Sequence, residues 1–134
     1  AFKRLFGPDF NVFSERHLNE SFFVDYETGR ISCEAFRQYF REVTKKEVSD
    51  TEIDFAWNAM LGDLPAVRIK WLEELKKDFK ICILSNTNVI HVTAFHEIFR
   101  KQTSHIHPTR LFDRVYYSCE MGMRKPDEDI YRAV

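Results

Sequence analysis

The sequence has no excess of charge of either sign and no long apolar segment. Its 134 residues include 20 basic and 21 acidic side chains, and the formal net charge is −1. This balance gives no electrostatic reason to expect nucleic acid or a membrane surface as a partner. No apolar run has the length of a membrane span or the layout of a signal peptide. We therefore expect a cytoplasmic protein that binds neither nucleic acid nor membrane.

Cysteine is scarce, and neither repeats nor low-complexity segments occur. The three cysteines, Cys33, Cys82 and Cys119, lie far apart in the sequence. We therefore expect buried, reduced thiols rather than a disulfide framework. Hydrophobic residues are plentiful: they make up 44% of the chain, and 13 residues are Phe. The chain is thus expected to be globular, as one domain or as a small domain with part of another.

The first half of the chain has the apolar spacing of several short helices. Ser32 and Ser49 are each placed to cap such a helix, and Glu52 completes a capping box with Ser49. Turns separate these segments, so the sequence predicts a small antiparallel helical bundle. Helices are expected over 1–6, over 15–26, from 33 to 43 and from 50 onward, and the last is expected to turn Ile53, Ala56, Trp57 and Met60 to one side.

After Pro65 the pattern changes to an alternation of helices and strands. A helix over 67–78 is expected to face inward with Val67, Trp71, Leu72 and Leu75. The apolar run 81–84 then suits a strand buried on both faces, a helix follows over 89–100, and a second strand is expected over 115–118. This alternation is typical of a parallel α/β sheet, so we expect a helical part over 1–64 and part of an α/β core over 65–134.

Four small polar residues follow the first predicted strand, namely Ser85, Asn86, Thr87 and Asn88. Ligands of open α/β sheets bind where the strands end at their carboxyl edge. The stretch is therefore a candidate ligand site. The alternative is that these residues only cap the helix that follows.

Two cations stand in front of a predicted helix near the end of the sequence. Arg124 and Lys125 precede Pro126, which suits a first helical position, and three acidic residues over 127–129. Cations at a helix N-terminus favour an anion there. The alternative is that both side chains reach solvent or pair with the nearby acids.

Taken together, these two stretches resemble the haloacid dehalogenase (HAD) superfamily. Ser85 matches the Ser or Thr of its second motif, and Lys125, in the stretch Gly-Met-Arg-Lys-Pro-Asp over 122–127, matches the Lys of its third motif. The fold class implied is α/β, a partial Rossmann-like HAD core with parallel strands and an inserted α-helical bundle cap. The stretches 26–31 and 84–88 look most like the subgroup that includes sugar-phosphate phosphatases such as glucose-1-phosphate phosphatase.

The resemblance implies hydrolysis of a small-molecule phosphate ester through a covalent aspartyl intermediate. Ser85 would donate a hydrogen bond to a phosphoryl oxygen, and Lys125 would offset charge on the nucleophile and the transferring group. Asn86 would help to hold the substrate, or the substrate carboxylate in a dehalogenase. The family's cofactor is Mg²⁺.

The sequence departs from the family pattern in one respect. No Asp-x-Asp follows an apolar strand, so the nucleophile, the acid/base Asp and all Mg²⁺ ligands are expected outside this chain. We interpret the chain as an interior excerpt of a phosphatase or dehalogenase-like hydrolase, inactive by itself. The alternatives are a catalytically dead relative that binds phosphorylated metabolites, and a helical protein-interaction module. The sequence does not predict the oligomeric state.

Other polar residues offer weaker candidates. His105 and His107 have the spacing of metal ligands but no third ligand nearby, and solvent-facing side chains are the better interpretation. His91 is close enough in sequence to Ser85 to touch a substrate. Glu27 and Arg30 lie in a turn of the expected cap and are candidates for leaving-group contacts; the alternative is a solvated turn.

Overall fold

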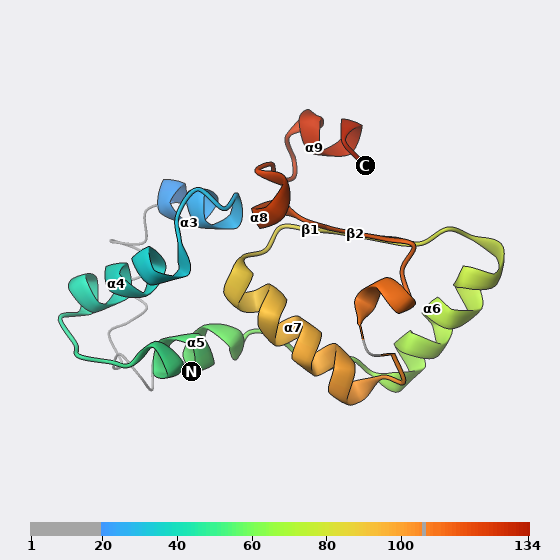
Figure 1. Ribbon diagram of the computed structural model, residues 1–134, viewed down its shortest axis with the longest axis horizontal. Helices are drawn as coiled ribbons and strands as arrows, with labels where there is room; N and C mark the ends of the chain where they lie inside the picture. Colours follow the sequence, from blue (N-terminus) through green and yellow to red (C-terminus); the bar gives the residue numbers. More distant parts are fainter. Residues whose placement is uncertain (1–19, 106) are drawn as a thin grey trace.

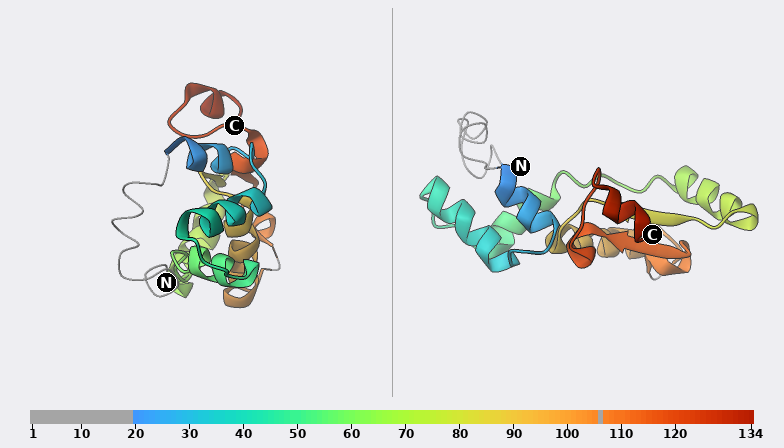
Figure 2. Two further views of the ribbon diagram at one scale, coloured as in Figure 1. Left: turned by 90° about the vertical axis from the view of Figure 1, so that its left-hand side faces the viewer. Right: turned by 90° about the horizontal axis from the view of Figure 1, so that it is seen from above.

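The computed structural model describes residues 20–105 and 107–134. Helices α3, α4 and α5 group at one end, and α6 lies at the other end beyond a two-stranded sheet (Figures 1 and 2). Within the described residues, no helix is long and apolar enough to cross a membrane. The predicted helix over 1–6 and the first residues of the helix predicted from 15 lie outside the described residues. The elements are α3 (Glu20–Glu27), α4 (Cys33–Thr44), α5 (Asp50–Asn58), α6 (Ala66–Asp78), β1 (Cys82–Ser85), α7 (Val89–Gln102), the 3₁₀ turn η1 (Pro108–Arg110), β2 (Arg114–Tyr117), α8 (Ser118–Met121) and α9 (Glu128–Arg132).

Both predicted caps of the helical half are confirmed. The Ser32 side chain accepts a hydrogen bond from the backbone N–H of Ala35 at 3.1 Å, at the start of α4. At the start of α5, Ser49 and Glu52 form the complete reciprocal capping box. Because the Ser32 cap and the Ser49–Glu52 box satisfy backbone N–H groups that a helix start leaves free, these residues fix where the helices begin.

An aromatic core holds the helical half together. The ring of Phe36 is fully buried and stacks on Tyr26 with centroids 4.0 Å apart. Ile90 of α7 belongs to the same core, so the helical half packs directly on the start of α7. The expectation for Met60 is wrong, because α5 ends at Asn58 and the Met60 side chain is 62% exposed. The buried members are Tyr26, Phe36, Phe40, Ile53 and Ile90.

The sheet confirms the predicted α/β class. Strands β1 and β2 run parallel and side by side, in register from Cys82 opposite Arg114 to Ser85 opposite Tyr117. Their carboxyl ends therefore share one edge, as predicted. The second strand is one residue out of place, because Ser118 begins α8 instead of ending β2. A second core lies between the sheet, α6 and α7, and its buried members are Ile69, Phe99, Leu111 and Phe112.

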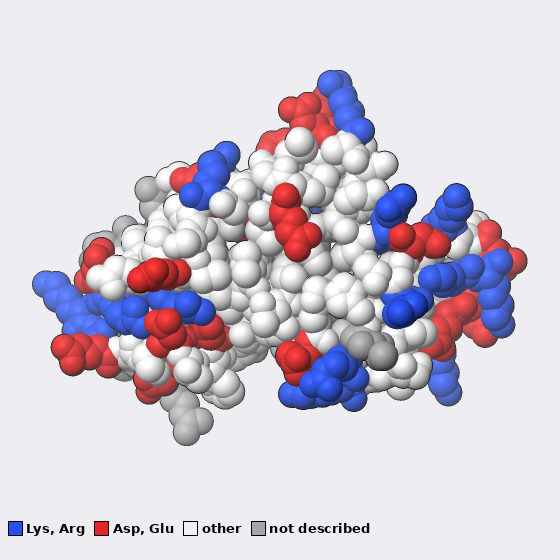
Figure 3. Space-filling model, in the orientation of Figure 1, with Lys and Arg blue, Asp and Glu red and all other residues white. Residues whose placement is uncertain are grey.

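The predicted inward face of α6 is largely wrong. Val67, Trp71 and Leu75 are 52%, 63% and 47% exposed, whereas Ile69 is buried and Leu72 packs against the second core. The reason is that α6 meets this core only along the row of Ile69 and Leu72, so the neighbouring row points away from it. On the face drawn in Figure 3, basic and acidic side chains intermingle over α4 and α6.

The cysteines are free, as predicted, but they are not buried. Cys33 and Cys119 are partly exposed, and Cys82 is exposed because it lies at the start of β1, on a sheet of two strands. Cys119 also lies in α8, not in a strand.

Candidate functional site

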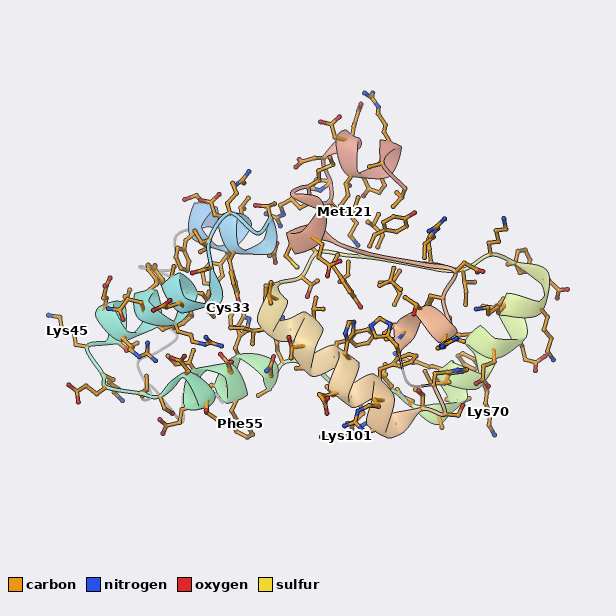
Figure 4. All side chains as sticks on the ribbon, viewed as in Figure 1. Cys33, Lys45, Phe55, Lys70, Lys101 and Met121 are labelled. Carbon is orange, nitrogen blue, oxygen red and sulfur yellow. The ribbon has the colours of Figure 1, made fainter. Side chains whose placement is uncertain are left out.

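The candidate site lies at the carboxyl edge of the sheet, where two segments meet. One is the stretch 85–88, which begins with the last residue of β1 and is called the β1 loop below. The other is the segment 118–125, which contains α8 and follows β2. Figure 1 shows α8 at this end of both strands, and Figure 4 marks its Met121 there. The parallel register brings the two segments together, because both strands end at the same level.

Lys125 folds back over the end of β1. Its ammonium group donates a hydrogen bond to the carbonyl oxygen of Leu84 at 2.8 Å. Leu84 is the residue directly before Ser85, so the cation lies close to the start of the β1 loop. The structure thus brings together the predicted site residues Ser85 and Lys125.

Both the amide nitrogen and the amide oxygen of the Asn86 side chain form hydrogen bonds. Its Nδ2 donates to the carbonyl oxygen of Lys125 at 2.8 Å, and its Oδ1 accepts from the backbone N–H of Lys125, also at 2.8 Å. Asn86 therefore joins the β1 loop to the Lys125 backbone. A direct contact of Asn86 with a substrate stays a prediction.

The backbone of Thr87 and the side chain of Asn88 make contacts that stabilise the fold. The hydroxyl of Ser118 accepts from the backbone N–H of Thr87 at 2.8 Å and donates to the Thr87 carbonyl at 3.0 Å. Asn88 caps α7, because its Oδ1 accepts from the backbone N–H of His91 at 3.0 Å. The capping alternative is therefore correct for Asn88.

The Ser85 side chain differs from those of Asn86 and Asn88. Within the described part of the chain, the one hydrogen bond that its hydroxyl donates is a long one of 3.4 Å, to the adjacent carbonyl of Asn86. Such a bond is weak, so the hydroxyl can turn to a ligand at small cost. A cavity of about 330 Å³, lined mainly by apolar side chains, opens beside Ser85 and Tyr117.

Arg124 does not pair with the acidic residues that follow it. Its guanidinium forms an ion pair with Glu27, at the end of α3, at 3.2 Å. Its Nε is buried without a hydrogen-bond partner among the described residues. Helix α9 begins at Glu128, after Asp127, so the expectation that Pro126 occupies the first helical position is wrong. The residue Arg30, the other candidate of the cap turn, pairs with Asp25 and is exposed.

His91 is a buried residue of α7 that contacts the helical half through Trp57. Its ring stacks on Trp57 with centroids 5.0 Å apart, and its Nε2 lies 3.2 Å from the Trp57 carbonyl. Its Nδ1 lies 3.2 Å from the Asn88 amide nitrogen. An imidazole protonated on Nε2 satisfies both contacts. Burial lowers the pKa of His91, which favours this neutral form.

His105 and His107 have local partners. His105 lies 3.0 Å from a Glu73 carboxylate oxygen, and His107 caps η1. Residues 20–105 and 107–134 contain no group of three His, Cys, Asp or Glu side chains that could hold a metal ion.

The sequence did not predict the role of Ser118 in joining the two segments. Ser118 directly follows β2, and Ser85 is the last residue of β1. A small hydroxyl residue at the end of each of two neighbouring parallel strands is the signal that could have indicated it. Glu27 was considered for a substrate contact, but its partner Arg124 was not predicted.

Comparisons with known proteins point to one family. No protein-family model matches the chain. Over 132 residues it is 23% identical to the D-ribitol-5-phosphate phosphatase of Bacteroides thetaiotaomicron. The crystal structure of a HAD family enzyme from the same organism matches with a TM-score of 0.90 at 32% identity, over 98% of this chain. An aspartate-to-alanine mutant of that enzyme, in complex with magnesium and inorganic phosphate, matches with a TM-score of 0.87. A predicted HAD-like family hydrolase from Porphyromonas gingivalis matches at 28% identity with a TM-score of 0.79.

The chain spans less than two thirds of these relatives. It covers 63% of the D-ribitol-5-phosphate phosphatase and 64% and 62% of the two enzymes from B. thetaiotaomicron and P. gingivalis. About a third of each relative therefore has no counterpart in the 134 residues.

Proposed function

Because this chain belongs to the HAD-like hydrolase superfamily, we propose that it is part of a phosphatase for small phosphorylated metabolites. The observation that carries the proposal is the position of Lys125, whose ammonium group lies on the carbonyl of Leu84, the residue directly before Ser85, while the Ser85 hydroxyl makes only a long bond of 3.4 Å. A cation and a neutral donor at one sheet edge suit a phosphoryl group.

The proposed roles follow from the chemistry of the two groups. Ser85 donates a hydrogen bond to a phosphoryl oxygen, and Lys125 offsets the negative charge that gathers during transfer. The aspartate nucleophile and the acid/base aspartate belong outside these 134 residues. The Mg²⁺ ligands that the family uses belong there as well. Bound Mg²⁺ would supply charge neutralisation at the phosphoryl oxygens.

The proposed division of labour places the helical cap in residues 1–64 and the partial core in 65–134. Support for a cap that reaches the site is the ion pair between Glu27 and Arg124, because Arg124 is the neighbour of Lys125. The similarity to a D-ribitol-5-phosphate phosphatase favours a phosphorylated sugar or sugar alcohol as the substrate of the protein that contains this chain.

The test is turnover of p-nitrophenyl phosphate by the full-length protein that contains this chain, with Mg²⁺ present. We expect Ser85→Ala to lower kcat about 100-fold, because one oxyanion donor contributes about 3 kcal/mol. Lys125→Ala should cost more, since it removes a full charge. Lys101→Ala is the matched control, because Lys101 is an exposed cation at the far end of α7 whose ion pair with Glu97 is 3.8 Å long.

Wild-type rates in both site variants would contradict the proposal. Binding of phosphate esters without any turnover by the wild-type protein would instead favour the catalytically dead relative.

A further inference from the structure

Two side-chain bridges connect the β1 loop to the segment after β2. In the first, the amide of Asn86 makes both a donor and an acceptor contact with the backbone of Lys125, each 2.8 Å long. In the second, the hydroxyl of Ser118 does the same with the backbone of Thr87, at 3.0 and 2.8 Å. The two bridges join residues 39 and 31 positions apart in the sequence.

These bridges lie directly after the last backbone pair of the sheet. The register of β1 and β2 ends at Ser85 opposite Tyr117. The next residues of the two strands, Asn86 and Ser118, use their side chains to continue the connection between the chains. Each such side chain satisfies one N–H and one C=O, as a paired strand would. The two chains therefore stay fastened together beyond the last ladder pair.

We propose that Asn86 and Ser118 are positioning residues that hold the Ser85 hydroxyl and the Lys125 ammonium group in their working geometry. The inference rests on the proposed phosphatase function. Asn86 is bonded to the backbone of Lys125 and is covalently next to Ser85, so it fixes both groups through a single residue. Thr87, held by the fully buried Ser118, anchors the other side of the loop.

The neutral chemistry of the bridges matters for this role. A carboxylate in place of Asn86 would hold the backbone N–H of Lys125 but would repel its carbonyl and a bound phosphate. An amide fastens the loop without neutralising the Lys125 charge. The lysine therefore keeps its full charge available for the substrate.

The experiment compares bridge variants with a matched control in the full-length protein. Asn86→Ala and Ser118→Ala each remove one bridge. The control is Gln102→Ala, because the Gln102 amide also makes one acceptor and one donor contact with a distant segment, at the far end of α7. Its Oε1 accepts from the backbone N–H of Leu64 at 2.7 Å and its Nε2 donates to Asp63 at 3.1 Å. The readouts are kcat and KM for p-nitrophenyl phosphate, the melting temperature, and amide hydrogen exchange at Lys125 and Thr87.

We expect Asn86→Ala to lower kcat about 100-fold, since misplacing a catalytic group by about 1 Å has an effect of this size. KM should change much less than kcat. Exchange of the Lys125 amide should accelerate about fivefold, as expected for the loss of a bond worth about 1 kcal/mol. Ser118→Ala should act in the same direction on the Thr87 amide. Gln102→Ala should lower the melting temperature by a similar amount and leave kcat unchanged.

Two results would overturn the inference in distinguishable ways. If the wild-type protein turns over the ester and Asn86→Ala retains the kcat of Gln102→Ala despite faster exchange at Lys125, the bridges are structural and positioning is refuted alone. If the wild-type protein shows no turnover, the proposed function fails and the positioning role fails with it.

Discussion

A substitution at Gly29, in the helical half, tests how closely that half packs against α8. Gly29 lies in the turn between α3 and α4 with φ of +70°, and a Cβ built there would overlap the carbonyl oxygen of Cys119 in α8. Gly122 has nearly the same φ, +69°, but nothing lies within 4 Å of its Cβ position. The two sites thus separate the effect of backbone conformation from the effect of contact.

The expected magnitudes follow from these two terms. A left-handed conformation costs a non-glycine residue about 1–2 kcal/mol, and the stiffer unfolded chain returns about 0.4–1 kcal/mol. Gly122→Ala should therefore destabilise the fold by about 1 kcal/mol. Gly29→Ala adds an overpacking cost of about 1–3 kcal/mol, because α8 or the turn must move. Its total should be about 2–4 kcal/mol.

The assay is urea-induced unfolding of the full-length protein and the two variants. Gly62→Ala serves as a further control, because Gly62 has no positive φ and nothing lies within 4 Å of its Cβ position. That variant should unfold close to the wild-type midpoint. Equal free energies of unfolding for Gly29→Ala and Gly122→Ala would refute the close contact between the turn and α8.

Three further outcomes are expected. Burial lowers the pKa of His91, so the unfolded chain binds its proton more readily. Stability should therefore fall as the pH drops below about 6.5, and His91→Leu should show a smaller loss between pH 7.5 and 5.5 in urea titrations; an unchanged loss would contradict this. Phe36→Ala should cost about 3–5 kcal/mol in thermal unfolding because its ring is fully buried. Phe55→Ala, at a site 77% exposed, should cost little, and similar losses for both would contradict the core assignment. Residues 1–134 expressed alone should be poorly soluble and show no Mg²⁺-dependent phosphatase activity, because two strands make a marginal sheet with an open edge; a cooperative melt would refute the first part and turnover the second.

The sequence predicted best those features that depend on neighbouring residues. The capping box of Ser49 and Glu52 is complete in the structure, since its hydrogen bonds span one helical turn. Strand β1 was predicted from an apolar run and a polar stop, and its parallel partner from the helix between them. The HAD family resemblance rested on two such strand ends and is supported by the structural matches.

Features that depend on a distant surface were predicted less well. Trp71 and Leu75 have the same helical spacing as true core positions, yet they are exposed and Ile69 is buried instead. Apolar periodicity shows that a helix has an apolar row but not which neighbour that row will meet. Arg124 is a similar case, because its partner Glu27 lies far away along the chain, in the helical half.

The candidate site shows the same limit at the level of single side chains. Ser85, Asn86, Thr87 and Asn88 are all small, polar and uncharged, so composition alone treats them alike. The structure assigns their hydrogen-bonding capacity to different partners: the Lys125 backbone for Asn86, Ser118 for the backbone of Thr87, and the start of α7 for Asn88. A buried polar group satisfied by the chain would have to give up that bond before it could bind a ligand, at about 1–3 kcal/mol. The Ser85 hydroxyl makes only a long bond to the next carbonyl, so in the proposed role of phosphoryl-oxygen donor it has less to give up than the amides of Asn86 and Asn88.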